Sequence, residues 1–170
     1  EFLAKYPAKG IRLSYARLLA DRKDIAAAKT QIEELVKSAP QDAETLIAGG
    51  ALAGQIKDFE TSERHLRRAL ELSPQQADDI RLYLGQIYED RKSFAEAEKW
   101  YRQIEPGEQY LGAQIKVANM LARQDRMEEA RNHLAQVQAT GQQRVQLILA
   151  EGQILREAKS YQSAFDRLTS

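Results

Sequence analysis

The chain has 170 residues, and its 25 Lys and Arg balance 25 Asp and Glu, so the formal net charge is zero. A neutral balance argues against nucleic acid as a partner, because phosphate binding requires a concentrated positive surface. The absence of cysteine excludes disulfides and thiolate metal sites, and no apolar run approaches the roughly 18 residues that a membrane-spanning helix needs.

The chain divides into five successive pairs of helices, each recognised by apolar residues at helical spacing. The expected pairs are 9–21 with 24–38, 42–55 with 58–72, 77–91 with 93–104, 109–123 with 126–138, and 143–157 with 160–168. Pro40 ends the first pair, and an early break at Pro106 ends the third. Residues 1–6 are interpreted as the tail of a preceding helix stopped by Pro7, so we expect an array cut at both ends.

Small residues recur at a nearly fixed period in both helices of each pair. They are Ala16, Gly50, Gly85, Ala118 and Gly152 in the first helices, and Ala28, Ser62, Ala97, Ala130 and Ala164 in the second, with gaps of 34, 35, 33 and 34 in both sets. Large apolar residues recur with the same period. They are Ile25, Phe59, Phe94, Met127 and Tyr161 in one set and Ile32, Leu66, Tyr101, Leu134 and Leu168 in another. Because small residues let two backbones approach closely, we expect the helices of each pair to cross there.

This pattern resembles the tetratricopeptide repeat, a helix pair of about 34 residues. The match is carried by Leu84-Gly85 with Tyr88, by Phe94 with Ala97 and Tyr101, and by the closing prolines Pro40 and Pro74. The resemblance implies an all-α fold, an α-solenoid with a right-handed superhelix of about five repeats. The expected repeats are 9–42, 43–77, 78–110, 111–144 and an incomplete 145–170, with 1–8 as the tail of a preceding one. The chain departs from the family pattern at four positions, where it has a polar residue and the family usually has an apolar one: Arg12, Arg81, Gln114 and Glu151.

Residues with catalytic or metal-binding potential are few. His65 and His133 share one repeat position on two different second helices, and we expect both to be solvated and to face outward. Acidic neighbours such as Glu128-Glu129 are adjacent on a helix and do not face each other. Gly49-Gly50 lacks the following Lys-Ser or Lys-Thr of a phosphate-binding loop. We therefore expect no enzymatic activity, no cofactor and no metal site.

A protein or peptide partner is what the resemblance implies, since the first helices of such arrays line a concave surface that commonly binds a peptide or a helix. The groove residues it implies are Leu13, Arg17, Ile47, Leu82, Gln86, Glu89, Ile115, Asn119, Leu149, Gln153 and Arg156. In an alternative interpretation, the apolar members of this set only complete contacts between neighbouring first helices. A clamp for an acidic C-terminus is not expected, because the Lys and Asn positions of that clamp hold Leu, Arg, Ala and Gln here.

A narrower resemblance concerns the third and fourth repeats. Leu84-Gly85-Gln86, the run from Trp100 to Ile104, Pro106-Gly107, Tyr110-Leu111 with Ala113, and Ala130-Arg131 with Leu134 look like tetratricopeptide lipoproteins of the Gram-negative outer membrane. Some of these hold a periplasmic carboxyl-terminal processing protease near its substrates. The resemblance implies a non-enzymatic adaptor in the periplasm, anchored to the outer membrane in the full-length protein, with a cytoplasmic location as the alternative.

Two other functions stay open. In the first, the chain is a structural module that self-associates through uncapped ends. In the second, it is a regulatory segment of a longer protein that contains an enzyme.

Overall fold

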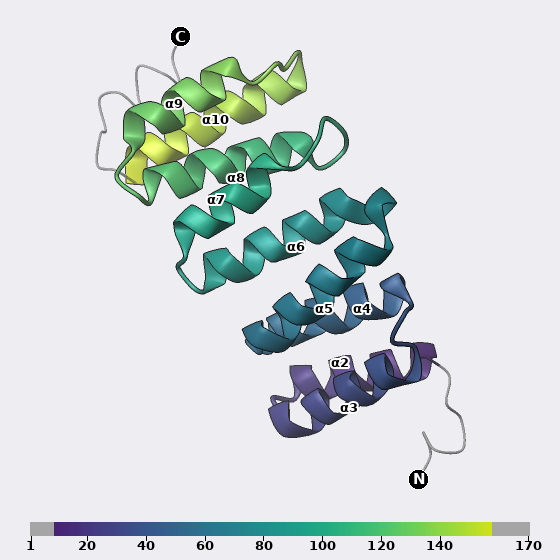
Figure 1. The fold of residues 1–170 in the computed structure, drawn as a ribbon. Coiled ribbons are helices and arrows are strands. Elements are labelled where there is room, and N and C mark those ends of the chain that lie inside the picture. Colours follow the sequence, from purple (N-terminus) through teal and green to yellow (C-terminus); the bar gives the residue numbers. More distant parts are fainter. Residues whose placement is uncertain (1–8, 158–170) are drawn as a thin grey trace. The chain divides into compact units, whose positions relative to one another are not determined.

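The computed structural model describes residues 9–157, and its helices follow one another in pairs (Figure 1). They are α2 (Lys9–Asp21), α3 (Ile25–Ser38), α4 (Ala43–Gln55), α5 (Phe59–Leu72), α6 (Ala77–Asp90), α7 (Phe94–Arg102), α8 (Tyr110–Ala122), α9 (Met127–Gln136) and α10 (Gln142–Glu157), with a 3-10 helix η1 at Pro74–Gln76. This range contains no β-strand, so the all-α prediction is confirmed. The predicted tail at 1–8 and the last predicted helix, 160–168, lie outside the described residues.

The chain forms two compact units that divide after Ile87. In the N-terminal unit α2 packs on α3, α4 packs on α5, and α3 also contacts α4 (Figure 1). In the C-terminal unit α8 packs on both α7 and α9, and α10 contacts α8 and α9. The N-terminal unit therefore contains two helix pairs stacked on each other, and in the C-terminal unit the pair α8–α9 is contacted by α7 and α10, as a repeat array requires.

The turn inside each of the first four helix pairs has the same backbone form. Lys23, Lys57, Lys92 and Asp125 end successive first helices with φ angles of 62°, 61°, 60° and 59°. In the first pair the Lys23 N–H donates to the Ala20 carbonyl and the Asp24 N–H to the Leu19 carbonyl, and the second pair repeats this arrangement. These paired bonds satisfy the last carbonyls of the helix. Asp24 and Asp58 then cap the following helices by accepting backbone N–H groups of Ala27 and Thr61.

The predicted close crossing is confirmed in the second repeat. A Cβ atom on Gly50 of α4 would lie 2.7 Å from Leu66 Cγ and 3.2 Å from the Ser62 carbonyl oxygen, both on α5. Gly50 and Ser62 are the small residues whose period marks this repeat. The absence of a side chain at Gly50 is therefore what lets α4 and α5 approach.

Two of the polar departures from the repeat pattern, Arg12 and Glu151, have partners on a neighbouring helix. Arg12 lies on the side of α2 that meets α3, where it donates to Gln31 and pairs with Glu34. Glu151 is buried on α10, and its Oε1 lies 3.4 Å from Nε of Arg131 on α9. At each of these two positions, an ion pair between two helices of the same unit therefore takes the place of an apolar contact.

Candidate binding surface

The predicted groove residues all lie on the first helix of a pair, and none of them is fully buried. Leu13 and Arg17 are on α2, Ile47 on α4, Leu82, Gln86 and Glu89 on α6, Ile115 and Asn119 on α8, and Leu149, Gln153 and Arg156 on α10. Half-buried apolar side chains beside polar ones give a surface that can bury area and fix orientation. Binding at these residues stays a prediction.

Leu13 shows what an apolar member of this set does in the N-terminal unit. It packs against the buried cluster of Ala16, Ile32, Leu52 and Ala53, which joins α2, α3 and α4. One side of Leu13 is therefore used for contacts between helices, as the alternative interpretation requires. Leu149 on α10 differs, because 56 % of its surface is exposed.

Glu89 is tied to two other helices of the C-terminal unit. Its Oε2 accepts a hydrogen bond from the Tyr101 hydroxyl at 2.9 Å and lies 3.0 Å from Lys116 Nζ. The Lys116 ammonium also lies 5.2 Å from the centre of the Tyr101 ring, within cation–π range. Burial, together with the Glu89 charge, raises the pKa of Tyr101 above its ordinary value. The carboxylate of Glu89 is thus committed to internal contacts, which weakens its predicted role as a partner contact.

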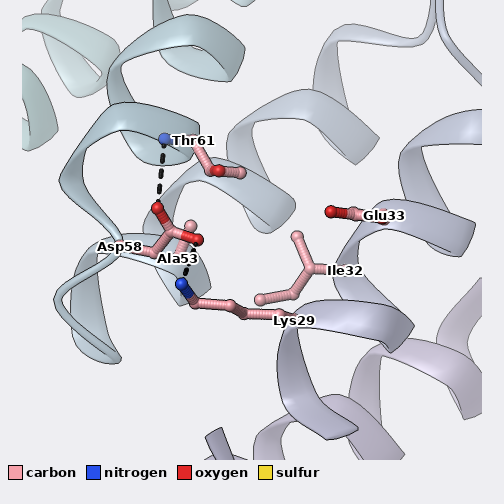
Figure 2. Close-up of a pocket in the computed structure, with 6 residues that line it drawn as sticks. All are labelled: Lys29, Ile32, Glu33, Ala53, Asp58 and Thr61. Carbon is pink, nitrogen blue, oxygen red and sulfur yellow. Dashed lines mark hydrogen bonds and ion pairs between the residues drawn. The ribbon is translucent and has the colours of Figure 1, made fainter. Parts of the chain in front are cut away.

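A shallow hollow in the N-terminal unit lies at the junction between two repeats (Figure 2). It is lined by Lys29, Ile32 and Glu33 of α3, Ala53 of α4, and Asp58 and Thr61 at the start of α5, and it leaves no space for a water molecule.

The Lys29 ammonium lies 3.0 Å from Asp58, and the Thr61 N–H donates to the other oxygen of the same carboxylate (Figure 2). Although burial disfavours the charged form of Asp58, these donors lower its pKa. The ion pair between Lys29 and Asp58 therefore links two successive repeats.

A buried carboxylate in the C-terminal unit escaped the sequence-based search. Glu98 on α7 accepts from Arg102 Nε at 2.8 Å, from Arg126 at 2.9 Å and from Gln124 Nε2 at 3.0 Å. Burial opposes its charge, but the donors from Arg102 and Gln124 lower the pKa of Glu98. Its repeat position, directly after the small residue Ala97, is the one that Lys29 occupies after Ala28. The shared repeat position of Glu98 and Lys29 is the sequence signal that could have identified Glu98 as a contact between repeats.

The prediction that both histidines are solvated is wrong. His65 is buried on α5, and Nε2 of His65 and of His133 lacks a hydrogen-bond partner. His133 is half-buried on α9, with Nδ1 3.4 Å from Arg102. Burial lowers the pKa of both rings, with Arg64 and Arg102 as nearby charges that add to the effect.

Two features that would point to other functions are missing from residues 9–157. No group of three His, Asp or Glu side chains in that range is placed to hold a metal ion. No helix there combines the length and the apolar character that crossing a bilayer demands.

Comparison with known proteins agrees with the repeat pattern. Residues 47–110 match the family model described as tetratricopeptide repeat. No curated protein matches the chain by sequence.

Solved structures share the fold. The chain is similar to a Podosopora anserina putative kinesin light chain with nearly identical TPR-like repeats, at 11% identity over 93% of this chain and 90% of that one, with a TM-score of 0.69. It is also similar to pilF of Pseudomonas aeruginosa, at 16% identity over 97% and 76% and a TM-score of 0.64. A third similar structure is MamA, at 18% identity over 94% and 80% and a TM-score of 0.61. At such identities the likeness shows the fold alone.

Proposed function

Since this chain is built of tetratricopeptide repeats, we propose that it is a non-enzymatic scaffold that binds a protein or peptide partner. The observation that supports this most is the composition of the first helices, where apolar and polar side chains recur from pair to pair at incompletely buried positions. Such a face buries apolar area on binding while its polar groups fix the orientation of the partner.

Each unit offers its own set of contact residues. In the N-terminal unit, Arg17 is exposed on α2, and its planar guanidinium suits a carboxylate of a bound peptide. Ile47, half-buried on α4, supplies apolar area there. In the C-terminal unit, Ile115 and Asn119 are four residues apart on α8, so an apolar side chain and an amide share one helix face. The partner that fits these groups is an extended peptide or an amphipathic helix.

We also propose that the full-length protein is an outer-membrane lipoprotein adaptor that holds a periplasmic processing protease near its substrates. The support is the resemblance over Leu84-Gly85-Gln86 and the stretch from Trp100 to Leu111. Cell fractionation followed by crosslinking tests this role, with the protein expected in the membrane fraction and crosslinked to a periplasmic protease. Recovery in the cytoplasm, or a crosslinked partner unrelated to proteolysis, contradicts it.

Affinity capture with matched variants tests the scaffold function. The double variant Leu82→Asp/Ile115→Asp places a charge in the proposed contact set of each unit, and we expect it to retain less than a tenth of the captured partner. Tyr83→Asp is the matched control, because Tyr83 is exposed on the same helix as Leu82 but outside the set. Circular dichroism establishes that all variants fold. A folded double variant that captures as much partner as the parent contradicts the proposal.

A further inference from the structure

A histidine ring lies between two repeats of the C-terminal unit, against the last residue of α7. That residue, Arg102, reaches two groups at once. Its Nε donates to Glu98 Oε1 at 2.8 Å, and its Nη1 lies 3.4 Å from Nδ1 of His133 on α9. Within the described part of the chain, the buried Nε2 of His133 has no hydrogen-bond partner. Arg102 therefore provides the polar contact that joins this ring to the preceding repeat.

The contact with Arg102 fixes the protonation state of the ring. A guanidinium can only donate hydrogen bonds, so Nδ1 of His133 must accept and the ring proton lies on Nε2. In the charged form of histidine both nitrogens carry a proton and both are donors. No orientation of a charged ring offers Arg102 an acceptor, and the two cations repel each other. The contact therefore requires a neutral His133.

Glu98 offers an acceptor to the charged ring. Its Oε2 accepts from Gln124 at 3.0 Å and from Arg126 at 2.9 Å, whereas its Oε1 accepts from Arg102. The carboxylate of Glu98 is also one of the charges that face His133. A proton on Nδ1 therefore allows the ring to take over Oε1, while Oε2 keeps the two donors that already hold it.

The surroundings of His133 set the range in which the ring becomes charged. Burial and then the charge of Arg102 lower the pKa of His133, and Glu98 opposes them. On α8 and α10, the helices that contact α9, Lys116 is paired with Glu89 and Glu151 with Arg131. The ring is therefore neutral at pH 7 and takes up its proton as the pH falls below the ordinary value of 6.5.

The equivalent junction in the N-terminal unit holds the opposite charge. His65 has the repeat position of His133, and Glu33 of α3 has the repeat position of Arg102. Glu33 favours the charged form of His65, whereas Arg102 disfavours that of His133. Protonation of His65 therefore does not displace a cation of the preceding repeat.

We propose that Arg102, Glu98 and His133 form a pH-sensitive switch between the third and fourth repeats. When His133 takes up a proton at Nδ1, the ring replaces Arg102 at Glu98 Oε1 and the guanidinium moves into solvent. The side chain of Arg102 is already 42 % exposed, so its way outward is open. Because Gln124 and Arg126 still hold Oε2, the two repeats stay linked. Acid thus places a free cation at the end of α7, three residues before the exposed segment 105–108.

Nitrogen-15 NMR of the 170-residue chain follows the ring and the guanidinium separately. At pH 7.5 the ring shifts should report a neutral His133 with its proton on Nε2. Between pH 7.5 and 5.5 the protection of the Arg102 Nε–H against hydrogen exchange, taken relative to free arginine at each pH, should fall at least twofold. The midpoint of this fall should coincide with the titration midpoint of His133.

Four variants separate the switch from general effects of acid. His133→Gln keeps an acceptor for Arg102 but cannot become charged, so the protection of Arg102 should not depend on pH. Arg102→Met removes the cation and should raise the titration midpoint of His133. Arg67→Met is its matched control, because Arg67 has the same position in the second repeat, and it should leave that midpoint unchanged. His65→Phe should leave the response of Arg102 as it is in the parent.

Three results, each in a chain that circular dichroism shows to be folded at both pH values, would overturn the proposal. Constant protection of Arg102 while His133 titrates would show that the guanidinium stays in place. A fall in protection that persists in His133→Gln would assign the response to another group. A His133 midpoint that Arg102→Met leaves unchanged or lowers would show that the two side chains do not oppose each other.

Discussion

Lys29 and Asp58 join two successive repeats, with the ammonium of α3 lying 3.0 Å from the carboxylate that caps α5. Glu98 and Arg126 occupy the same two repeat positions in the C-terminal unit with the charges exchanged, and their side chains lie 2.9 Å apart. The link between repeats therefore depends on opposite charges at fixed positions and not on which helix carries the cation.

The two links should differ in strength because their burial differs. Glu98→Ala removes a nearly buried acceptor from Arg102, Gln124 and Arg126, so we expect it to lower the free energy of unfolding by about 1–3 kcal/mol. Lys29→Ala removes one exposed partner and should cost less than about 1 kcal/mol. Urea denaturation of both variants at pH 7 measures the two values. Equal losses would show that burial does not decide the strength of the link.

Alanine at two helical glycines should have opposite effects. Gly50→Ala places a methyl group 2.7 Å from buried Leu66, and the overpacking should cost about 1–3 kcal/mol, more than the gain in helix propensity of about 1 kcal/mol. Gly112→Ala on α8 meets nothing within 4 Å, so it should leave stability unchanged or raise it. Thermal unfolding of the two variants measures the difference. A Gly50→Ala protein as stable as the parent would contradict the close crossing of α4 and α5.

The sequence was sufficient to predict the helices within residues 9–157 and the close crossing of α4 and α5, because apolar spacing and small residues report contacts between packed helices. Gly50 is the clearest case. Its place in the repeat predicted a close contact between helices, and a Cβ atom there would meet Leu66 and Ser62. The left-handed turn residues were not foreseen. Lys23, Lys57 and Lys92 adopt positive φ without the glycine that usually signals this turn.

Polar partners were harder to predict than the fold, because they depend on which long side chains reach one another. Glu89 was assigned to a groove by its repeat position, yet Tyr101 and Lys116 from two other helices hold its carboxylate. His65 was expected in solvent, but its ring packs against α4, where its Cδ2 lies 3.9 Å from the position that a Cβ atom on Gly49 would take.

Tyr101→Phe should separate the packing role of Tyr101 from its hydrogen bond. The change keeps the buried ring and removes the hydroxyl that donates to Glu89, so we expect a loss of about 1 kcal/mol. Lys116→Met should cost less in the parent, because Tyr101 still donates to Glu89, and more in the Tyr101→Phe background. A double-mutant cycle by urea denaturation measures this coupling. Strict additivity would mean that Glu89 does not join the two donors into one network.

Stability should fall between pH 7 and 5.5 because His65 and His133 are harder to protonate in the folded chain. Their folded-state pKa values lie below the ordinary value of 6.5, so the unfolded chain binds more protons in this range. The stability is present above pH 6.5 and is lost as pH falls from there towards the lowered values, by up to about 1 kcal/mol per histidine at pH 5.5.

The charges that face His65 are Arg64, Asp58 and Glu33, and those that face His133 are Arg102 and Glu98. The carboxylates with lowered pKa values, Asp58 and Glu98 among them, are ionised in both folded and unfolded chains above pH 5.5, so they contribute little in this window.

His65→Phe tests whether the two histidines cause this loss of stability. The change keeps an aromatic ring and removes the buried Nε2 that lacks a hydrogen-bond partner. We expect the urea midpoint of His65→Phe at pH 7 to equal or exceed that of the parent, since an unsatisfied buried polar atom is gone. Its decline towards pH 5.5 should be about half as steep as the parent's, because His133 alone remains to take up a proton. His65→Phe/His133→Phe should be flat over the same range. A double variant that still weakens between pH 7 and 5.5 would place the sensitivity in groups other than these two rings.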